Sequence, residues 1–206
     1  MAVSAPEIRA VFFDIGNVIV RFDPKVVARK IAWALRRHPV KVARYLWSSA
    51  AIEAIERGEM TASELFALFR GEFGYAGDYR AFRKLWCDHF ALIRPNAALL
   101  KKLARTHKVY LLSNTNDLHY EYLRKRYAFA GQVHGAILSY ELRMRKPEPR
   151  IYDAAVKLAG RPAGECLFID DNLENIEAAR RFGMQVIHHT PGHDLKAAFA
   201  KLGLLG

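Results

Sequence analysis

Cysteine is scarce in this chain, with only two residues among 206. Cys87 and Cys166 lie far apart and match neither a metal-binding nor a disulfide spacing, so we expect two free thiols. No apolar run approaches the roughly 20 residues that a membrane span needs. Residues 1–7 have neither a basic start nor an apolar core, so we expect no signal peptide. The resulting prediction is a cytoplasmic protein that does not contact a membrane.

Acidic residues are also few. The chain has 21 Asp and Glu and 32 Lys and Arg, which gives a formal net charge of +11. The basic clusters are spread over several predicted helices, and no arm, zinc finger or RNA-binding signature accompanies them. We therefore predict solvated helix faces and no nucleic-acid partner. A positive field of this kind attracts anionic substrates, including phosphate esters.

The chain is organised around residues 10–20, where an apolar run ends at Asp14, a Gly16-Asn17 turn follows, and a second apolar run begins. The first run is short and rich in β-branched and aromatic residues, so it predicts a buried strand. In an open α/β sheet, ligands bind at the carboxyl ends of the strands, which is where Asp14 would stand. A single Asp at such a place is equally typical of a turn or a helix cap.

Between residues 22 and 94 the pattern predicts helices only. Asp23, followed by a proline, is a helix start, and a capping box begins at Thr61. Residues 71–77 are expected to form a loop, and Asp78 to begin a further helix. The leucines and aromatic residues of this segment are predicted to form the core of a small helical bundle. Each tryptophan is expected in that core, with contact to a substrate as the alternative: Trp33, Trp47 and Trp86.

Strands and helices alternate from Pro95 onward. Short apolar runs predict strands at residues 109–113, 136–140, 166–170 and 185–188. This alternation implies βαβ units and a parallel sheet. The predicted fold class is α/β, a Rossmann-like doubly wound parallel sheet with an inserted all-helical domain. We place the α/β core at residues 1–20 and 95–206, and the inserted domain at 21–94.

Reactive side chains follow three further strands of the predicted sheet: Ser113 and Asn114, Lys146, and Asp170 and Asp171. The carboxyl ends of parallel strands share one edge of a sheet, so we expect these groups beside Asp14. Carboxylates that close repel one another unless a cation neutralises them, and Mg²⁺ is a hard cation suited to carboxylate, water and phosphate oxygens. With Lys146 and Ser113 placed to hold phosphate oxygens, the site fits phosphoryl transfer, with a carboxylate as nucleophile.

These stretches resemble, in order, the four motifs of the haloacid dehalogenase superfamily: Phe-Phe-Asp14-Ile-Gly-Asn, Leu-Leu-Ser113-Asn, Arg-Lys146-Pro-Glu and Phe-Ile-Asp170-Asp171-Asn. A helical cap after the first motif is also that family's arrangement, so the resemblance covers essentially the whole chain. It implies a Mg²⁺-dependent phosphatase that hydrolyses a small phosphorylated metabolite through an aspartyl-phosphate. The motif wording is similar to the branch that contains bacterial α-D-glucose-1-phosphate phosphatase, which implies a sugar phosphate such as a sugar-1-phosphate.

By this resemblance, Asp14 is the nucleophile and also a metal ligand. The backbone carbonyl of Gly16 is a second ligand, Asp171 binds the metal directly, and Asp170 binds it directly or through water. Ser113 and Asn114 hold the phosphoryl group, and Lys146 bridges that group to Asp14. The implied partner is a small phosphate ester, bound by a monomer or a homodimer.

The sequence departs from the commoner family pattern at Gly16. Most phosphatases of the family carry a second Asp at this position, which acts as general acid and then base. Losing general acid catalysis typically costs roughly 10²–10⁴-fold. An anomeric hydroxyl is more acidic than an ordinary alcohol, so we hypothesise that Gly16 and a sugar-1-phosphate substrate belong together. Asp23, Asp88 and His89 are the side chains that could replace the missing acid.

Other interpretations remain open at this point. A 2-haloacid dehalogenase would use the same Asp nucleophile without a metal, but its relatives lack the paired acids at Asp170 and Asp171. A phosphoglucomutase-like enzyme depends on the acid that Gly16 replaces. A degenerate member would bind a phosphosugar or a protein partner without turnover. His188, His189 and His193 are best interpreted as strand-end and loop residues, because the Thr-Pro-Gly between the second and third precludes helical metal-ligand spacing.

Overall fold

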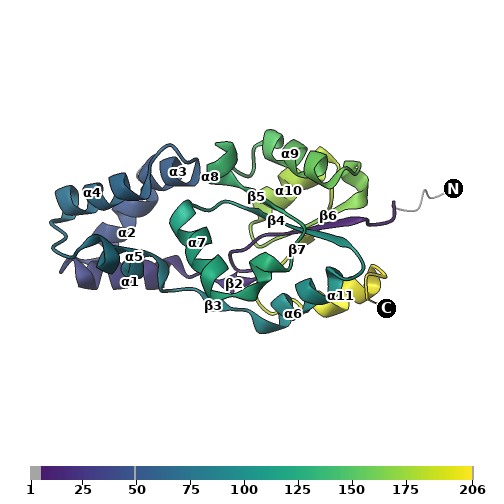
Figure 1. The fold of residues 1–206 in the computed structure, drawn as a ribbon, viewed down its shortest axis with the longest axis horizontal. Helices are drawn as coiled ribbons and strands as arrows, with labels where there is room; N and C mark the ends of the chain where they lie inside the picture. Colours follow the sequence, from purple (N-terminus) through teal and green to yellow (C-terminus); the bar gives the residue numbers. More distant parts are fainter. Residues whose placement is uncertain (1–5, 49, 206) are drawn as a thin grey trace.

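The computed structural model describes residues 6–48 and 50–205, and its centre is a five-stranded parallel sheet in the order β5-β4-β1-β6-β7 (Figure 1). The strands are β1 (Ala10–Phe13), β4 (Lys108–Ser113), β5 (Ala136–Leu138), β6 (Cys166–Asp170) and β7 (Gln185–His188). β1 lies in the middle, where Phe13 is level with Leu111 of β4 and Ile169 of β6. The predicted α/β fold with a parallel sheet is confirmed.

Helices cover both faces of this sheet (Figure 1). Val11 and Phe13 of β1 belong to the core that includes α6 (Arg94–Leu103) and α11 (Leu195–Lys201). The alternate residues of β1, Ala10 and Phe12, belong to the core that includes α9 (Pro149–Ala159) and α10 (Leu173–Phe182). Successive strand side chains point to opposite faces, and both faces are buried here, which explains why all four residues of β1 are apolar and buried.

Five helices pack together beyond the carboxyl end of the sheet (Figure 1). They are α1 (Pro24–Ala34), α2 (Pro39–Ser48), α3 (Ala50–Glu56), α4 (Ala62–Phe73) and α5 (Tyr79–Cys87). The Asp23 carboxylate accepts hydrogen bonds from the first turn of α1, Thr61 and Glu64 form the capping box of α4, and Asp78 caps α5. The predicted helix starts are thus confirmed, since each cap satisfies backbone N–H groups that have no partner within the helix.

A two-stranded antiparallel pair, β2 (Val20–Arg21) and β3 (Ala91–Leu92), joins these helices to the sheet. The prediction of helices only between residues 22 and 94 is therefore wrong at β3. The segment that leads from the sheet into the helices (β2) pairs with the segment that leads back (β3). Two strands so distant in sequence produce no local periodic pattern that could predict their pairing.

Three other local predictions are wrong. α4 runs on to Phe73 and ends where Gly74 takes a left-handed φ of 64°, so the loop begins later than residue 71. Tyr140 belongs to α8 (Ser139–Leu142) rather than to β5. Trp33 is 86% exposed, because it lies on the opposite side of α1 from the buried Val27 and Ile31.

The remaining helical elements are α7 (Asp117–Arg126) and two 3₁₀ turns, η1 (Ala128–Gly131) and η2 (Ala163–Glu165). Trp86 is buried among the cap helices as predicted, while the side chain of Trp47 lies outside the described residues. Cys87 and Cys166 are both free and buried, as expected. Among the helices described, none combines the length and apolar character that a bilayer crossing requires.

Candidate active site

Three strand ends and one loop bring the predicted reactive groups together. Asp14 directly follows β1, Ser113 ends β4, and Asp170 ends β6. Asp14, Asp170 and Asp171 each offer an oxygen atom within 4.8 Å of the others. This convergence follows from the parallel sheet, whose strands all end at the same edge.

Lys146 is the cation of this group, and its side chain is almost completely buried. Its Nζ lies 2.8 Å from Asp14 Oδ1 and donates hydrogen bonds to Asp170 Oδ2 at 2.6 Å and to the Leu112 carbonyl at 3.0 Å. Burial lowers the pKa of Lys146, but the negative charges of Asp14 and Asp170 outweigh it and hold that pKa above its usual value. Lys146 therefore stays charged throughout the physiological pH range.

Asp14 lies in a less favourable electrostatic position. Burial raises its pKa to about 6, with a contribution from the charge of Asp170, while Lys146 opposes the rise. Its Oδ1 atom is buried and, within the described part of the chain, pairs with Lys146 in a contact that lacks hydrogen-bond geometry. Asp14 Oδ1 is therefore shielded from water and is balanced by the charge of Lys146.

Asp170, the last residue of β6, and Asp171, the next residue, differ in the number of hydrogen bonds that they accept from the rest of the chain. Asp170 is fully buried and accepts hydrogen bonds from the Asn172 backbone N–H at 2.7 Å and from the Asn175 amide at 3.1 and 3.2 Å. Asp171 is partly exposed and accepts one bond, from the Asn17 amide at 2.9 Å. Asp171 thus has the greater free capacity for a ligand.

Asn17 and Asn175 are positioning residues that sequence reasoning missed. The Asn17 side chain joins Asp171 to the backbone N–H of Phe22 at 2.9 Å, and its own φ is 50°. Their sequence positions could have indicated them. Asn17 belongs to the first motif, and Asn175 lies five residues after Asp170, in the first turn of α10.

The donor set fits a divalent cation. Three carboxylates against one ammonium group leave an excess of negative charge at the strand ends. The under-coordinated Oδ1 of Asp14 adds an acceptor that is already stripped of water. Hard cations such as Mg²⁺ take oxygen ligands of this kind, and a bound cation would offset both the burial that raises the Asp14 pKa and the smaller contribution of Asp170.

Asn114 holds the backbone of Lys146 in place. Its amide nitrogen donates to the Lys146 carbonyl at 2.9 Å, and its amide oxygen accepts from the Lys146 N–H at 2.8 Å. Both ends of this side chain are therefore engaged, which leaves its backbone for other contacts. Ser113 is almost completely buried beside Asp14.

Gly16 has room for a side chain. A Cβ atom built at this position would meet Asp14 Oδ2 at an ordinary contact distance of 3.8 Å, and its φ is not in the left-handed region. The missing acid is therefore not excluded by crowding or by backbone strain.

None of Asp23, Asp88 and His89 lines the pocket that contains Gly16, Ser113 and Asn114, although Asp23 lines a second hollow together with Asp171. The Asp23 carboxylate is used as the cap of α1, and Asp88 accepts from the Tyr122 hydroxyl at 2.8 Å. His89 packs against Phe22 and Phe90, and burial lowers its pKa to about 4, so its ring is neutral at pH 7. We find no support in this geometry for any of the three as the proton donor.

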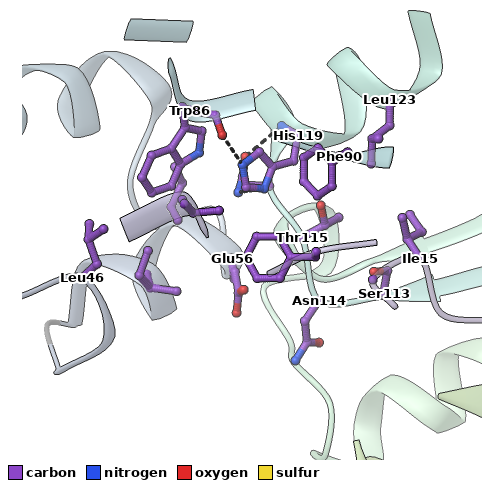
Figure 2. A pocket seen from close by; sticks show the side chains of 16 residues that line it. Ile15, Leu46, Glu56, Trp86, Phe90, Ser113, Asn114, Thr115, His119 and Leu123 are labelled. Atoms are coloured by element: carbon purple, nitrogen blue, oxygen red, sulfur yellow. Dashed lines mark hydrogen bonds between the residues drawn. The ribbon is translucent and has the colours of Figure 1, made fainter. Parts of the chain in front are cut away.

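A pocket of about 140 Å³ lies between the cap helices and the strand ends, and it is lined by Gly16, Ser113 and Asn114 on the core side (Figure 2). Aromatic side chains of Trp86, Phe90 and His119 form one wall, as the close-up shows. The rest of the cap side is mostly aliphatic and comes from α1, α2 and α3: Val27, Leu46, Ile52 and Ile55.

Ion pairs fix α3 to the loop that carries Lys146. Arg145 lies 2.7 Å from Glu56 Oε2, and Arg57 lies 2.6 Å from Glu148. Glu56 also lines the pocket, and burial raises its pKa while Arg145 opposes the rise. These ion pairs hold the end of α3, which forms part of the pocket wall, next to the loop that carries Lys146.

The model of the haloacid dehalogenase-like hydrolases matches residues 8–183 of this chain. The chain belongs to this family. This hydrolase is 27% identical to the sesquiterpene phosphatase astK of Aspergillus oryzae, over 88% of its own length and 90% of that protein. It is 26% identical to the D-ribitol-5-phosphate phosphatase of Bacteroides thetaiotaomicron, over 91% and 94% of the two chains.

A solved structure from the same family supports the fold of this hydrolase. It is a haloacid dehalogenase family enzyme from Bacteroides thetaiotaomicron in complex with magnesium and inorganic phosphate. The two chains superpose with a TM-score of 0.82 and 27% identity, over 93% of this hydrolase and 99% of that enzyme. Similarity to the glucose-1-phosphate phosphatase branch in particular stays a prediction.

Proposed function

We propose that this hydrolase is a Mg²⁺-dependent phosphatase that cleaves a small phosphate monoester through an aspartyl-phosphate on Asp14. The observation that carries the proposal is the position of Lys146, which pairs with Asp14 and Asp170 next to Ser113. The contacts of Asp14 with the buried cation and with Ser113 support its proposed role as the nucleophile. The phosphatase names of two relatives and the magnesium and phosphate bound to a third support the same reaction.

Magnesium would be held by Asp14, Asp171 and the backbone carbonyl of Gly16, with Asp170 binding directly or through water. When bound, the ion would neutralise charge on the phosphoryl oxygens and on the carboxylates. Asp170 would mainly orient Lys146, because its two oxygens already accept bonds from Lys146, Asn172 and Asn175.

In the proposed first step an Asp14 oxygen attacks phosphorus, and the bond from phosphorus to the alcohol oxygen breaks. Lys146, the Ser113 hydroxyl and the backbone N–H of Asn114 hold the phosphoryl oxygens as their charge shifts. In the second step water attacks phosphorus, which releases inorganic phosphate and restores the Asp14 carboxylate. The leaving alkoxide takes its proton from solvent, because Gly16 offers no acid.

The proposed substrate class is a small phosphate ester. The sequence hypothesis of a sugar phosphate such as a sugar-1-phosphate stays a prediction, since the relatives are named for a sugar alcohol phosphate and for a sesquiterpene. We further propose that residues 21–94 act as the cap over a core of residues 1–20 and 95–206. A cytoplasmic location and a monomer or homodimer also stay predictions.

Removing the metal tests the proposed function. Phosphate release from a panel of monoesters is expected with Mg²⁺ and is expected to vanish in EDTA, because the excess negative charge then repels the phosphate. Halide release from 2-haloacids without metal would instead support the dehalogenase interpretation. Binding of esters without any turnover would support the non-enzymatic one.

Gly16→Asp tests the role assigned to the missing acid. In the wild type, kcat/KM is expected to fall steeply as the leaving alcohol becomes less acidic. The variant places a carboxyl group in free space beside Asp14, so its rate on alkyl phosphates is expected to rise about tenfold or more, with little gain on aryl phosphates. Gly71→Asp, in α4 of the cap with no atom near an added Cβ, is the matched control. A flat leaving-group dependence in the wild type would contradict this account.

A further inference from the structure

We infer that the organic group of the substrate is apolar and about the size of a benzene ring, rather than a sugar or other polyol. The inference rests on the proposed function and narrows its substrate class. It comes from the pocket that shares Gly16, Ser113 and Asn114 with the reactive groups (Figure 2). A phosphate held at Ser113 and Lys146 would direct its organic group into this space.

The lining of the pocket is the first argument. Its cap side presents aliphatic side chains from α1, α2 and α3 together with Trp86 and Phe90. Transfer of an apolar group from water onto such a surface is favourable in proportion to the area buried. A hydroxyl group moved there without a hydrogen-bond partner loses its hydration without compensation.

The polar side chains in the lining are the second argument, because most already have partners within the chain. His119 Nε2 lies 3.1 Å from the Trp86 carbonyl, and its Nδ1 lies 3.1 Å from the Asn116 amide nitrogen. These contacts are satisfied by a neutral ring that donates to the carbonyl and accepts from the amide. Burial lowers the pKa of His119 to about 3, which agrees with that neutral state.

Asn114 and Asn116 are engaged in the same way. Both ends of the Asn114 amide bond to the Lys146 backbone, and the Asn116 side-chain oxygen accepts from the backbone N–H of His119 at 3.0 Å. Glu56 forms an ion pair with Arg145 at 2.7 Å, but its Oε2, like Trp86 Nε1, is buried without a hydrogen bond among the described residues. A polyol would find these two groups open to it, and its other hydroxyl groups would have to displace the internal contacts of His119, Asn114 and Asn116.

The volume is the third argument. The pocket encloses about 140 Å³. A protein cavity of about 150 Å³ with an apolar lining stays dry and binds benzene. The pocket therefore accepts an organic group of about six to eight non-hydrogen atoms without any rearrangement.

Benzyl phosphate and glycerol 3-phosphate test the inference, because both are esters of primary alcohols and differ mainly in the polarity of the organic group. We expect kcat/KM for benzyl phosphate to exceed that for glycerol 3-phosphate by at least about tenfold. Equal rates, or a preference for glycerol 3-phosphate, would overturn the inference and leave the proposed function intact. If Mg²⁺ and Asp14 prove unnecessary for hydrolysis, the proposed function fails instead.

Ile52→Asn links the preference to the pocket wall, because it replaces a hydrocarbon side chain with a smaller polar amide at a partly buried lining position. The ratio of the two kcat/KM values is expected to shrink about tenfold. Leu158→Asn makes the same kind of change at a residue of α9 that is 45% exposed and outside the pocket, and the ratio should stay at the wild-type value. An equal loss on both esters in Ile52→Asn would contradict the inference.

A binding measurement separates the pocket from turnover. Calorimetry with Asp14→Asn, which leaves the pocket wall unchanged, should show tighter binding of benzyl phosphate than of glycerol 3-phosphate. The opposite order would overturn the inference even if neither ester is hydrolysed.

Discussion

Asp14→Asn is expected to lower the kcat for Mg²⁺-dependent phosphate release by about 10⁴-fold or more, since an amide cannot attack phosphorus. The fold should survive, because Lys146 keeps its 2.6 Å bond to Asp170 and the carbonyl of Leu112 still accepts from it. Steady-state phosphate release and a thermal melt of the same preparation would measure the two effects separately.

Asp153→Asn is the matched control for this substitution. Asp153 lies on α9, its side chain is 48% exposed, and its partner is the surface residue Lys157. Exposed pairs of this kind contribute little, so activity and melting temperature should both stay near the wild-type values. Retention of activity in Asp14→Asn would mean that another group attacks phosphorus.

Lys146→Met is expected to harm both stability and activity. It leaves Asp14 and Asp170 buried without their shared cation, and removing one partner of a buried ion pair typically costs about 3–5 kcal/mol. Activity should fall at least about 10²-fold, because a fixed positive charge on the phosphoryl oxygens is lost. Urea unfolding and phosphate release would measure the two losses.

Magnesium should stabilise Lys146→Met more than the wild type, because it then supplies the only neutralising charge for the paired acids. Lys157→Met removes an exposed lysine that also pairs with an Asp, and we expect almost no change in stability. A Lys146→Met protein as stable as the wild type in EDTA would show that the buried carboxylates do not depend on Lys146.

The sheet could be predicted because its signal is local. β4 and β6 are short, largely apolar runs that are buried almost throughout, and they end in the polar residues Ser113 and Asp170. Ligands bind where parallel strands end, and this rule is enough to predict that Asp14 lies beside Asp171. Helix starts were equally accessible, because Asp23 and Thr61 are capping residues with a fixed local role.

The pocket could not be predicted because its wall depends on how the helices of the cap pack. Trp33 and Trp86 are indistinguishable by composition, yet one is 86% exposed and the other 4% exposed. Helical periodicity says which residues share a face but not which face meets the core. His119 became part of the wall only when α5 and α7 packed together and its ring met the Trp86 carbonyl.

Asn114 shows a different limit. Its place directly after Ser113 was informative, but the hydrogen bonds of its amide to the Lys146 backbone join two loops that are distant in sequence. Hydrogen bonds between distant loops have no periodic signature. The sequence therefore does not reveal that the Asn114 side chain positions Lys146, and a role of Asn114 in holding the phosphoryl group stays a prediction.

Trapping the phosphoenzyme tests the central claim most directly. The wild type would be mixed with Mg²⁺ and phenyl phosphate, quenched in acid within milliseconds, reduced with borohydride and analysed by peptide mass spectrometry. Borohydride converts an acyl phosphate to an alcohol, so our account predicts homoserine at position 14 and none in EDTA. Rapid turnover with an unmodified Asp14, or with the label on another carboxylate, would contradict it.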